Sequence, residues 1–424
     1  MKIEEFIELR FGLFIHFGLY SLLERCEWVM NREEIPREEY RQLADRFDPV
    51  SFSAEAIADL AVEAGMKYLV FTTMHHDGFR LYDSELSDFC STKTGSRRDF
   101  TAEIIAAAKS RGLRVGLYHS LNNWMDTPDG ADALEDPAAY ERFLSNTMNR
   151  IRELVTRYQP VDILWYDGWW PFHADGWRAE EMNAMVRKIQ PNILINGRNG
   201  LPGDFATPEG HLACPEPWRP WEACITHNRS WGYSAGDDRW KSPTEIVSML
   251  ATCAAKRGNL LLNIGPRGDG SIPEASVDAL EKVGAWIQRN REAVFTNERF
   301  TVDFHHRGDY RSDWNYHGRV TAAGNAFYLN IMRWPGSAFT LGGVESKVLR
   351  VSLLDGGREL SFVQNGTRLK VGGLPDSSPD PVCTVVKFEC AGPPMLYQCG
   401  GLRIPTVPHP HYDPCASDML NDTQ

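Results

Sequence analysis

Several features that would place the chain in a common functional class are missing. No run of 18 apolar residues is present, so the sequence predicts no membrane-spanning helix. The nine cysteines show no C-x-x-C spacing, which favours reduced thiols over disulfides or a zinc site. There is no H-E-x-x-H, and the turn Phe17-Gly18-Leu19 lacks the G-x-G-x-x-G of a dinucleotide-binding sheet. We therefore expect neither a metal nor a cofactor.

Basic clusters are also missing. The chain has 45 Lys and Arg against 57 Asp and Glu, a formal net charge of −12, which argues against nucleic acid as a partner. The first residues, Met1-Lys2-Ile3-Glu4-Glu5, are acidic where a signal peptide would be basic and then apolar. We expect a cytoplasmic protein, or a secreted one if a leader has been trimmed. The sequence does not decide between a monomer and a homo-oligomer.

What is present is an alternation of apolar strand-like runs with helix-like stretches over the first 290 residues. Five stretches have apolar residues at the three- and four-residue spacing of a helix: 54–64, 102–108, 143–155, 180–189 and 246–255. This order predicts parallel βαβ units and, with seven or eight of them, a (β/α)8-like barrel with its active site at the carboxyl ends of the strands. Polar residues follow or end the strand-like runs as such a site requires: His16, His75-His76, His119, Asp167, Arg198 and Asn263.

The segment Ile163-Leu164-Trp165-Tyr166-Asp167-Gly168 is the most informative of these runs. Four apolar or aromatic residues before a turn indicate a buried parallel strand. A carboxylate at the exit of such a strand must be hydrated, paired or functional. Taken alone, Asp167 could simply cap the next turn; the repetition of polar strand ends along the chain favours a catalytic role.

The composition changes after a last helix-like stretch at 273–289. Short β-prone segments at 325–332, 347–353, 359–363 and 382–388, separated by Gly, Asp and Ser, are typical of a β-sandwich. The sequence therefore predicts a catalytic barrel over residues 1–295 and a β-sandwich domain over 296–399. The proline-rich end, 400–424, is expected to be an irregular tail.

Seven segments, in their order along the chain, closely resemble the α-L-fucosidases of glycoside hydrolase family 29. They are Ile15-His16-Phe17-Gly18, Glu27-Trp28, His75-His76-Asp77-Gly78-Phe79, Leu117-Tyr118-His119-Ser120, Trp165-Tyr166-Asp167-Gly168, Trp221-Glu222 with Trp231-Gly232-Tyr233, and Leu261-Leu262-Asn263-Ile264-Gly265-Pro266. The resemblance covers about residues 8 to 290. It implies the same fold, a barrel followed by a β-sandwich. It also implies hydrolysis of α-L-fucosides with retention, through a covalent intermediate on Asp167.

The resemblance leaves the acid/base open among three carboxylates expected in loops. Glu209, in Asp204-Phe205-Ala206-Thr207-Pro208-Glu209, resembles the segment that carries the proton donor in several members and is favoured. Glu222 would otherwise be a buried carboxylate that orients Arg198 or the loop. Glu216, between two prolines, suits an exposed loop.

The resemblance also implies a set of sugar-binding residues: His16, Glu27, Trp28, His75, His76, His119, Trp165, Arg198 and Trp231. Many relatives have Tyr-Tyr-Ser where this chain has Tyr118-His119-Ser120, so the contact at His119 would come from an imidazole. Three alternatives stay open: an α-L-galactosidase-like enzyme, a metal-dependent hydrolase on a similar barrel, and a non-catalytic carbohydrate-binding protein. The expected partner is a fucosylated glycan or glycoside.

Overall fold

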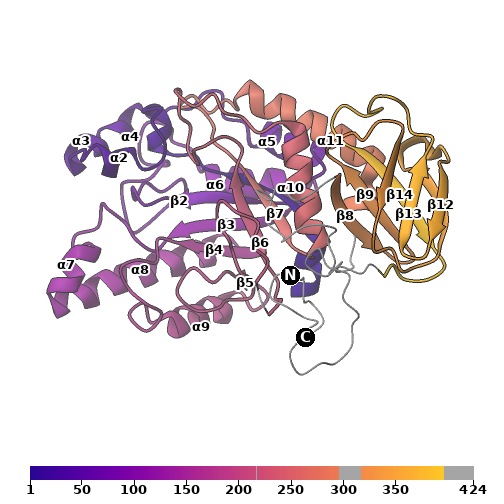
Figure 1. The fold of residues 1–424 in the computed structure, drawn as a ribbon. Helices are drawn as coiled ribbons and strands as arrows, with labels where there is room; N and C mark the ends of the chain where they lie inside the picture. Colours follow the sequence, from indigo (N-terminus) through magenta and orange to yellow (C-terminus); the bar gives the residue numbers. More distant parts are fainter. Residues whose placement is uncertain (216, 296–316, 396–424) are drawn as a thin grey trace.

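The computed structural model describes residues 1–215, 217–295 and 317–395. An α/β barrel extends from the N-terminus through helix α11, and two antiparallel sheets follow it (Figure 1). The predicted fold class is thereby confirmed. The predicted boundary at 295/296 adjoins residues outside the described ranges, and the predicted tail, 400–424, lies entirely outside them.

The barrel is built on a seven-stranded parallel sheet in the order β5-β4-β3-β2-β1-β7-β6. Nearly every residue of these strands is buried, because helices or loops cover one face and the barrel interior the other. The strands are β1 (Phe11–Ile15), β2 (Tyr68–Met74), β3 (Arg114–Ser120), β4 (Ile163–Asp167), β5 (Leu194–Ile195), β6 (Glu222–Thr226) and β7 (Asn259–Ile264).

An extended segment, residues 205–209, occupies the eighth position, between β5 and β6. Phe205 forms a parallel bridge with Asn196, while Ala206 and Glu209 bridge in parallel to Trp221 and Cys224. This closes the ring of strands that the sequence predicts as a (β/α)8-like barrel. It also brings Glu209 to the rim, because the segment runs in the same direction as its neighbours.

Helices connect the strands, and several begin at clear capping residues. Asp136 accepts hydrogen bonds from the backbone N–H groups of Ala138 and Ala139 at the start of α8, and Ser242 with Glu245 forms a capping box on α10. The helical elements of the barrel are α1 (Ile3–Leu9), η1 (Leu19–Leu22), α2 (Val29–Arg32), α3 (Arg37–Arg41), α4 (Leu43–Arg46), α5 (Ala54–Glu63), α6 (Phe100–Ser110), α7 (Gly130–Glu135), α8 (Pro137–Arg157), α9 (Ala179–Ile189), α10 (Pro243–Ala255) and α11 (Glu274–Val294).

The C-terminal part consists of a three-stranded sheet, β10-β13-β12, and a four-stranded sheet, β11-β14-β9-β8. Apolar side chains from both sheets, including Phe339, Val371 and Phe388, share one core. Its elements are β8 (Gly318–Ala323), β9 (Ala326–Ile331), β10 (Ala338–Leu341), β11 (Val348–Leu353), η2 (Asp355–Gly357), β12 (Ser361–Asn365), β13 (Arg368–Gly372) and β14 (Thr384–Cys390).

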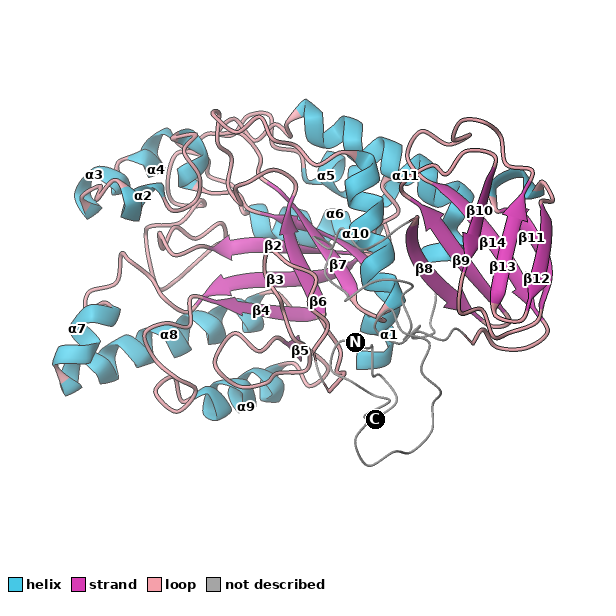
Figure 2. Cartoon of the chain, in the orientation of Figure 1, coloured by secondary structure: helices cyan, strands magenta, loops and turns pink. Residues whose placement is uncertain are grey.

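Helices α10 and α11 join the sandwich to the barrel (Figure 2). The buried indole of Trp286 donates a hydrogen bond to the Cys383 carbonyl oxygen at 2.6 Å, and Thr244 Oγ1 donates to the Val382 carbonyl oxygen at 2.8 Å. The arrowheads of β2 and β3 point away from the sandwich in Figure 2. The sandwich therefore packs far from the carboxyl ends of these strands.

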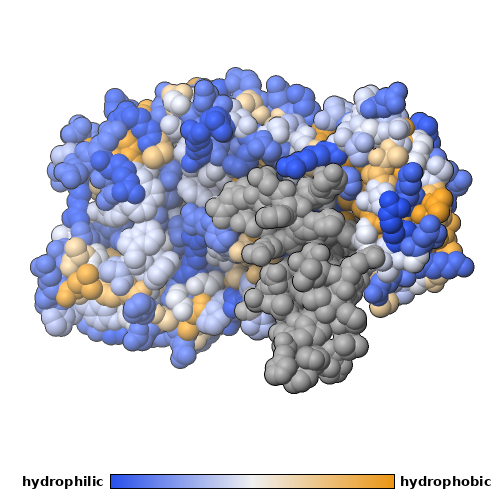
Figure 3. Space-filling view, viewed as in Figure 1, coloured by the Kyte–Doolittle hydropathy of each residue, from blue (hydrophilic) through white to orange (hydrophobic). Residues whose placement is uncertain are grey.

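The coloured surface in Figure 3 shows no large apolar area, and the cysteines of the described residues form no disulfides. On the face in Figure 3, apolar residues of the coloured part lie in small separate groups among polar ones. Within the described ranges no helix is long and apolar enough to cross a membrane. The seven cysteines found there, of nine in the chain, are all free thiols.

Candidate active site

A cavity of about 180 Å³ opens at the carboxyl ends of the barrel strands. Aromatic rings make up most of its wall, and the polar groups are gathered around one carboxylate. Its lining residues are Phe14, His16, Trp28, His75, His76, Tyr118, Trp165, Asp167, Trp170, Arg198, Glu209, Cys224 and Trp231. A small cavity with apolar walls and a few convergent polar groups is the usual form of a site for one small ligand.

Asp167, the last residue of β4, is the carboxylate at the centre of this cavity. Its Oδ1 accepts a hydrogen bond from Arg198 Nη1 at 3.0 Å, and its Oδ2 accepts one from the Tyr118 hydroxyl at 2.8 Å. Burial alone would raise the pKa of Asp167, but the guanidinium charge and the hydroxyl donor outweigh it and hold the pKa below its usual value. Asp167 is therefore a mostly buried carboxylate whose lowered pKa favours the ionised form.

The residue after Asp167 must be glycine. Gly168 has φ of +68°, and a Cβ at this position would lie 2.6 Å from Ser120 Oγ. A side chain would thus be strained by the backbone and would also collide with β3. The Asp-Gly pair that stands out in the sequence is a turn that brings the chain out of β4 while the carboxylate stays in the cavity.

Glu209 and Asp167 both form an ion pair with the guanidinium of Arg198. Arg198 Nη1 is 2.7 Å from Glu209 Oε2 and 3.0 Å from Asp167 Oδ1, so these two oxygens cannot be farther apart than the sum of the two distances. That limit agrees with the separation of about 5 to 5.5 Å in retaining glycosidases and is shorter than the roughly 6.5 to 9.5 Å of inverting ones. The Glu209 side chain is 45% exposed, in contrast to the 14% of Asp167.

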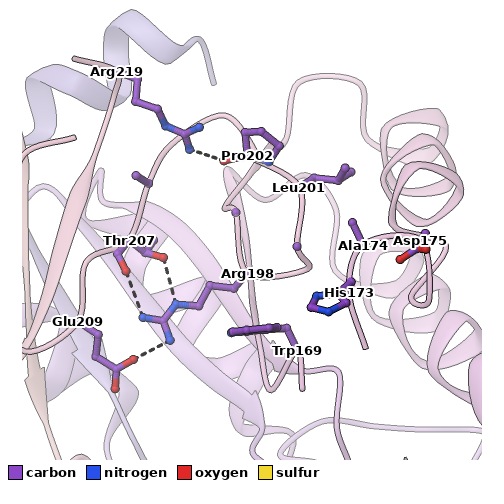
Figure 4. A pocket seen from close by; sticks show the side chains of 13 residues that line it. Trp169, His173, Ala174, Asp175, Arg198, Leu201, Pro202, Thr207, Glu209 and Arg219 are labelled. Atoms are coloured by element: carbon purple, nitrogen blue, oxygen red, sulfur yellow. Dashed lines mark hydrogen bonds and ion pairs between the residues drawn. The ribbon is translucent and has the colours of Figure 1, made fainter. Parts of the chain in front are cut away.

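Arg198 is fixed from several sides. Its Nε donates to Thr207 Oγ1 at 3.0 Å and its Nη2 to the Thr207 carbonyl oxygen at 3.2 Å, as Figure 4 shows. The guanidinium also lies over the Trp165 ring, 4.7 Å from its centroid. Burial lowers the pKa of Arg198, but Asp167 and Glu209 raise it above the usual value, so the group is a permanent cation.

The histidines of the cavity are neutral hydrogen-bonding groups. Burial lowers the pKa of His16 to about 3 and that of His76 to about 4. The pKa of His75 is also lowered well below its usual value, chiefly by burial, and its Nδ1 has no protein partner. Buried imidazoles with such low pKa values exchange hydrogen bonds with a ligand without adding charge.

The tautomer of His16 follows from its neighbour. Asn263 Nδ2 donates to the Trp231 carbonyl oxygen at 2.7 Å, which leaves Asn263 Oδ1 as the acceptor for His16 Nδ1–H at 2.6 Å. His16 Nε2 then carries no proton and accepts. The same reasoning applies to His76. Ser120 Oγ donates its hydrogen bond to the Asn122 carbonyl oxygen, so it accepts one from His76 Nδ1–H. His76 Nε2, which lies 3.7 Å from Asp167 Oδ2, therefore carries no proton and is an acceptor too.

Glu222 does not line the cavity. It is the first residue of β6, at the opposite end of that strand from the site, and the loop position predicted for it is wrong. Its carboxyl oxygens accept hydrogen bonds from the Tyr68 hydroxyl at 2.5 Å and from Trp165 Nε1 at 2.9 Å. Glu222 is thus a buried carboxylate that orients Trp165 rather than Arg198. Glu216 lies outside the described residues.

Two residues predicted to contact the sugar, Glu27 and His119, are not among those that line the cavity. His119 is fully buried but points away from the cavity, because alternate residues of β3 face opposite sides and Tyr118 takes the inner one. Glu27 accepts a hydrogen bond from the backbone N–H of Gly232 at 2.8 Å and holds the loop that carries Trp231. Neither residue lines the cavity, and the predicted contact of each with the sugar stays a prediction.

Tyr118 and Trp170 line the cavity although sequence reasoning did not select them. Tyr118 stacks on Trp165, with ring centroids 5.6 Å apart, while its hydroxyl binds Asp167. Trp170 stacks on Trp28 at 5.7 Å. The signal for Tyr118 was its inward register next to His119; for Trp170 it was the second aromatic after the Asp-Gly turn. The other predicted contacts, His16, Trp28, His75, His76, Trp165, Arg198 and Trp231, all line the cavity.

The donor chemistry gives the class of the protein. Across the described residues, no three His, Cys, Asp or Glu side chains gather closely enough to hold a metal ion. An ionised aspartate and an exposed glutamate meet at one guanidinium, in an aromatic cavity at the carboxyl ends of a barrel. This arrangement defines a glycoside hydrolase of the retaining type.

Comparison with known proteins agrees with this class and gives the family of the hydrolase. A family model described as "Alpha-L-fucosidase" matches residues 2–292. The tissue alpha-L-fucosidase of Rattus norvegicus is 31% identical over 360 residues, covering 78% of this chain and 76% of the relative. The chain belongs to the α-L-fucosidase family, glycoside hydrolase family 29.

Solved structures resemble the chain over most of its length. Alpha-L-fucosidase isoenzyme 1 from Paenibacillus thiaminolyticus is 34% identical, with a TM-score of 0.81 over 92% of this chain and 100% of that one. A fucosidase from Bacteroides thetaiotaomicron, described as a trapped covalent intermediate with 2-fluoro-fucosyl fluoride, is 26% identical, with a TM-score of 0.79 over 91% of this chain and 95% of the other.

Proposed function

We propose that this protein hydrolyses α-L-fucosidic bonds with retention, with Asp167 as nucleophile and Glu209 as acid/base. The observation that carries the proposal is the geometry of Asp167, which Arg198 and Tyr118 hold by hydrogen bonds while Arg198 also contacts a second carboxylate, Glu209. The family match supports the substrate, and the trapped covalent intermediate described for the Bacteroides relative supports the mechanism.

In the first step, an Asp167 oxygen attacks the anomeric carbon while Glu209 gives its proton to the leaving oxygen. The bond from carbon to the leaving group breaks and a fucosyl ester of Asp167 forms. In the second step, Glu209 takes a proton from water, the water oxygen attacks the anomeric carbon, and the ester breaks. Two displacements at one carbon restore its original configuration.

The ion pair between Arg198 and Glu209 has a consequence for this cycle. Arg198 Nη1 binds both carboxylates, so Glu209 must leave the guanidinium before it can act as a proton donor. The exposed position of Glu209 leaves it free to move, whereas Asp167 is held on two sides. We propose that substrate binding separates Glu209 from Arg198 and leaves Arg198 to Asp167 alone.

Sugar recognition is proposed for the imidazoles and rings around Asp167. His16 Nε2 and His76 Nε2 are acceptors for sugar hydroxyl donors, and Arg198 is a donor. Trp231, which packs on His16 with ring centroids 5.1 Å apart, provides an apolar surface for the C5 methyl group of fucose. A pocket with apolar walls rejects an extra hydroxyl by only modest factors, so α-L-galactosides are the competing substrates to compare.

The test is hydrolysis of an aryl α-L-fucoside followed by NMR in its first minutes. We expect α-L-fucose to appear first and to mutarotate later, with kcat/KM higher than on the matching α-L-galactoside. Release of the β-anomer first would contradict the retaining mechanism. Faster galactoside hydrolysis would reassign the substrate.

Three further expectations stay predictions: that neither nucleic acid nor a membrane is a partner, that the protein is cytoplasmic, and that it works without metal. The net charge of −12 supports the first of them. Activity that survives a chelator unchanged would support the last, and activity lost on chelation and restored by a metal would contradict it.

A further inference from the structure

A polar cavity of about 230 Å³ lies outside the sugar site. Its wall comes from the last residue of α3, from the segments 78–89 and 123–126 that follow β2 and β3, and from α8. The residues that line it are all different from those that line the cavity around Asp167. It is therefore a separate cavity, and the proposed reaction makes no use of it.

Three arginines make the wall of this cavity positive. Arg41 comes from α3, Arg80 from the segment after β2 and Arg150 from α8, while Asp126 is the one acidic residue among the described residues that line it. The chain as a whole carries a formal net charge of −12, so the surplus of positive charge here is local. A hollow lined by charge of one sign attracts ligands of the opposite sign. We call this cavity the arginine pocket.

Asp126 compensates only one of the three guanidinium groups. It accepts hydrogen bonds from Arg150 Nη1 and, at 2.7 Å, from Asn123 Nδ2. Arg150 is only 1% exposed, and its Nη2 donates to Thr147 Oγ1 at 3.0 Å. Its buried Nε has no hydrogen-bond partner in the part of the chain that the structure describes. Arg150 is thus fixed in place and still has a donor to offer.

Arg80 is buried with fewer partners still. It is 6% exposed, and its Nη1 donates to Ser84 Oγ. The nearest oxygen of Glu153 lies 3.8 Å from Arg80 Nη1, beyond hydrogen-bond distance, because that carboxylate already accepts from Ser84 Oγ and from the backbone N–H groups of residues 85 and 86. Arg80 Nε is buried and meets no acceptor among the described residues. Buried donors without a partner are rare in folded proteins and indicate a bound ion or water.

Arg41 adds an accessible cation to the two buried ones. Its guanidinium lies 5.1 Å from the centroid of the Phe89 ring, and it forms no ion pair with any described residue. Neutral donors lie beside the cations. Asn149 Oδ1 accepts a hydrogen bond from Arg152 Nη1 at 2.7 Å, which leaves the amide N–H groups of Asn149 as donors in the wall.

This donor set defines the class of ligand. Guanidinium groups match the geometry of phosphate, sulfate and carboxylate oxygens, and such charge-assisted hydrogen bonds are stronger than neutral ones. Three cations against one carboxylate favour an anion of charge −2 over one of charge −1. The volume is below the roughly 300 to 1,000 Å³ of sites for drug-sized ligands, so the pocket suits a single small group.

We propose that the arginine pocket binds one tetrahedral oxyanion, a phosphate or sulfate group, between Arg41, Arg80 and Arg150. The anion would connect α3, the segment that follows His75-His76, and α8, so its binding should stabilise the folded chain. The inference goes beyond the proposed function and does not depend on it. A free inorganic anion and an ester on a saccharide present the same chemistry to the pocket, and the test distinguishes them.

The first measurement is thermal unfolding of the full chain at constant ionic strength, with sodium chloride exchanged for sodium phosphate or sodium sulfate. A ligand that binds only the folded state adds RT ln(1 + [L]/Kd) to the free energy of unfolding. We therefore expect Tm to rise by roughly 2 °C or more once the anion is well above its Kd. Calorimetric titration with phosphate should give one site per chain.

Variants assign this binding to the pocket. Arg41→Gln and Arg80→Met should each weaken phosphate binding by roughly tenfold or more, the size of one charge-assisted hydrogen bond. Arg46→Gln is the matched control, because it removes an exposed arginine of the neighbouring helix α4 that does not line the pocket, and it should leave the Kd unchanged. Arg41 is exposed, so Arg41→Gln decides the question if Arg80→Met fails to fold.

The source of the group follows from comparing inorganic sulfate with galactose 6-sulfate. Tighter binding of the ester would assign the pocket to a sulfated saccharide, and tighter binding of inorganic sulfate would assign it to a free anion. Equal Tm in chloride, phosphate and sulfate would overturn the proposal. So would binding that persists in both pocket variants and competes with fucose, because it would place the anion at Arg198. Hydrolysis of an aryl α-L-fucoside reports separately on the proposed function.

Discussion

Two carboxylates near Trp165 behave in opposite ways: Asp167 lies two residues after it on β4, and Glu222 accepts a hydrogen bond from its indole. Asp167, at the carboxyl end of β4, is bound by Arg198 and Tyr118, and its pKa is held below the usual value. Glu222, at the start of β6, accepts hydrogen bonds from Tyr68 and from Trp165 itself, and burial raises its pKa to about 7. The Asp167 side chain is 14% exposed and Glu222 is fully buried, yet desolvation acts to raise the pKa of both, so burial alone does not explain the difference.

The difference comes from the charge of the partners. A guanidinium compensates a buried carboxylate fully, whereas a phenol and an indole offer neutral donors that compensate it only in part. One end of the barrel therefore keeps a negative charge ready for a reacting carbon, while the other keeps a carboxyl group that is protonated more readily than usual and supports an aromatic ring. Variants at the two ends should separate chemistry from structure.

The largest effect is expected for Asp167→Ala. Without the nucleophile no glycosyl ester can form, so kcat on an aryl α-L-fucoside should fall by roughly a thousandfold or more. Azide or formate, small enough to fill the space of the carboxylate, should restore part of the turnover. Circular dichroism should show an intact fold. A folded variant that keeps more than a small fraction of wild-type activity would contradict the nucleophile assignment.

The next effect depends on the substrate. An acid catalyst matters most for a poor leaving group, so Glu209→Ala should slow cleavage of a fucosyl oligosaccharide by roughly 100- to 10,000-fold and hardly slow the first step on an activated aryl fucoside. The second step still needs the base, so glycosyl-enzyme should accumulate on the aryl substrate and mass spectrometry should detect it. Azide should release it as a fucosyl azide of retained configuration.

Parallel variants at the other two candidate carboxylates complete this experiment. We expect neither Glu222→Gln nor Glu216→Ala to accumulate glycosyl-enzyme or to be rescued by azide. For Glu222 the reason is that it is hydrogen-bonded to Trp165 and does not line the cavity. The role would pass to whichever of them showed the leaving-group dependence if Glu209→Ala did not.

Smaller effects are expected in the sugar cavity. His16→Ala and His76→Ala each remove an acceptor for a sugar hydroxyl, which should cost about 1 to 3 kcal/mol, or roughly 5- to 150-fold in kcat/KM. His119→Ala is the matched control, because this imidazole is equally buried but points away from the cavity. It should lower thermal stability and leave KM unchanged. A similar kinetic loss for all three variants would return the histidines to a structural role.

Residue patterns sufficed for the barrel and for the position of Asp167 at the end of a strand, because hydrophobic period and strand ends are local properties of the sequence. They failed where the answer depends on register or on the partner across the barrel. His119 follows Tyr118 directly, and a one-residue step reverses the face of a strand. The motif Trp221-Glu222 was expected in a loop, but Glu222 is the first residue of β6, and the extended segment 205–209 bridges to this strand.

The hydrogen-bond partners of Glu27 and Glu222 could not be derived from the sequence, although a buried carboxylate was one of the alternatives left open for Glu222. Each is a buried carboxylate whose partner is distant in the chain: the Gly232 backbone for Glu27, and Tyr68 and Trp165 for Glu222. Family resemblance marks such residues because the site needs them. It does not distinguish a contact with the sugar from a contact with the residue that touches the sugar.

The role of Glu222 can be tested through the stability of the protein rather than its activity. The pKa of Glu222 is about 7 in the folded protein and near 4.5 when unfolded, so the folded state binds a proton more tightly than the unfolded state. The contribution of Glu222 to the free energy of unfolding should therefore fall as pH rises from about 4.5 to 7 and level off above that range. The difference in pKa corresponds to about 3 kcal/mol.

Glu222→Gln mimics the protonated carboxyl group and cannot ionise. Relative to wild type, this variant should gain stability as pH rises from 5 to 8, by an amount on the order of 3 kcal/mol, while its hydrogen bonds to Tyr68 and Trp165 keep the indole in place. Urea unfolding of both proteins at several pH values measures the difference. A parallel pH dependence in the two proteins would show that Glu222 is as fully compensated as Asp167, and the contrast between the two ends of the barrel would then disappear.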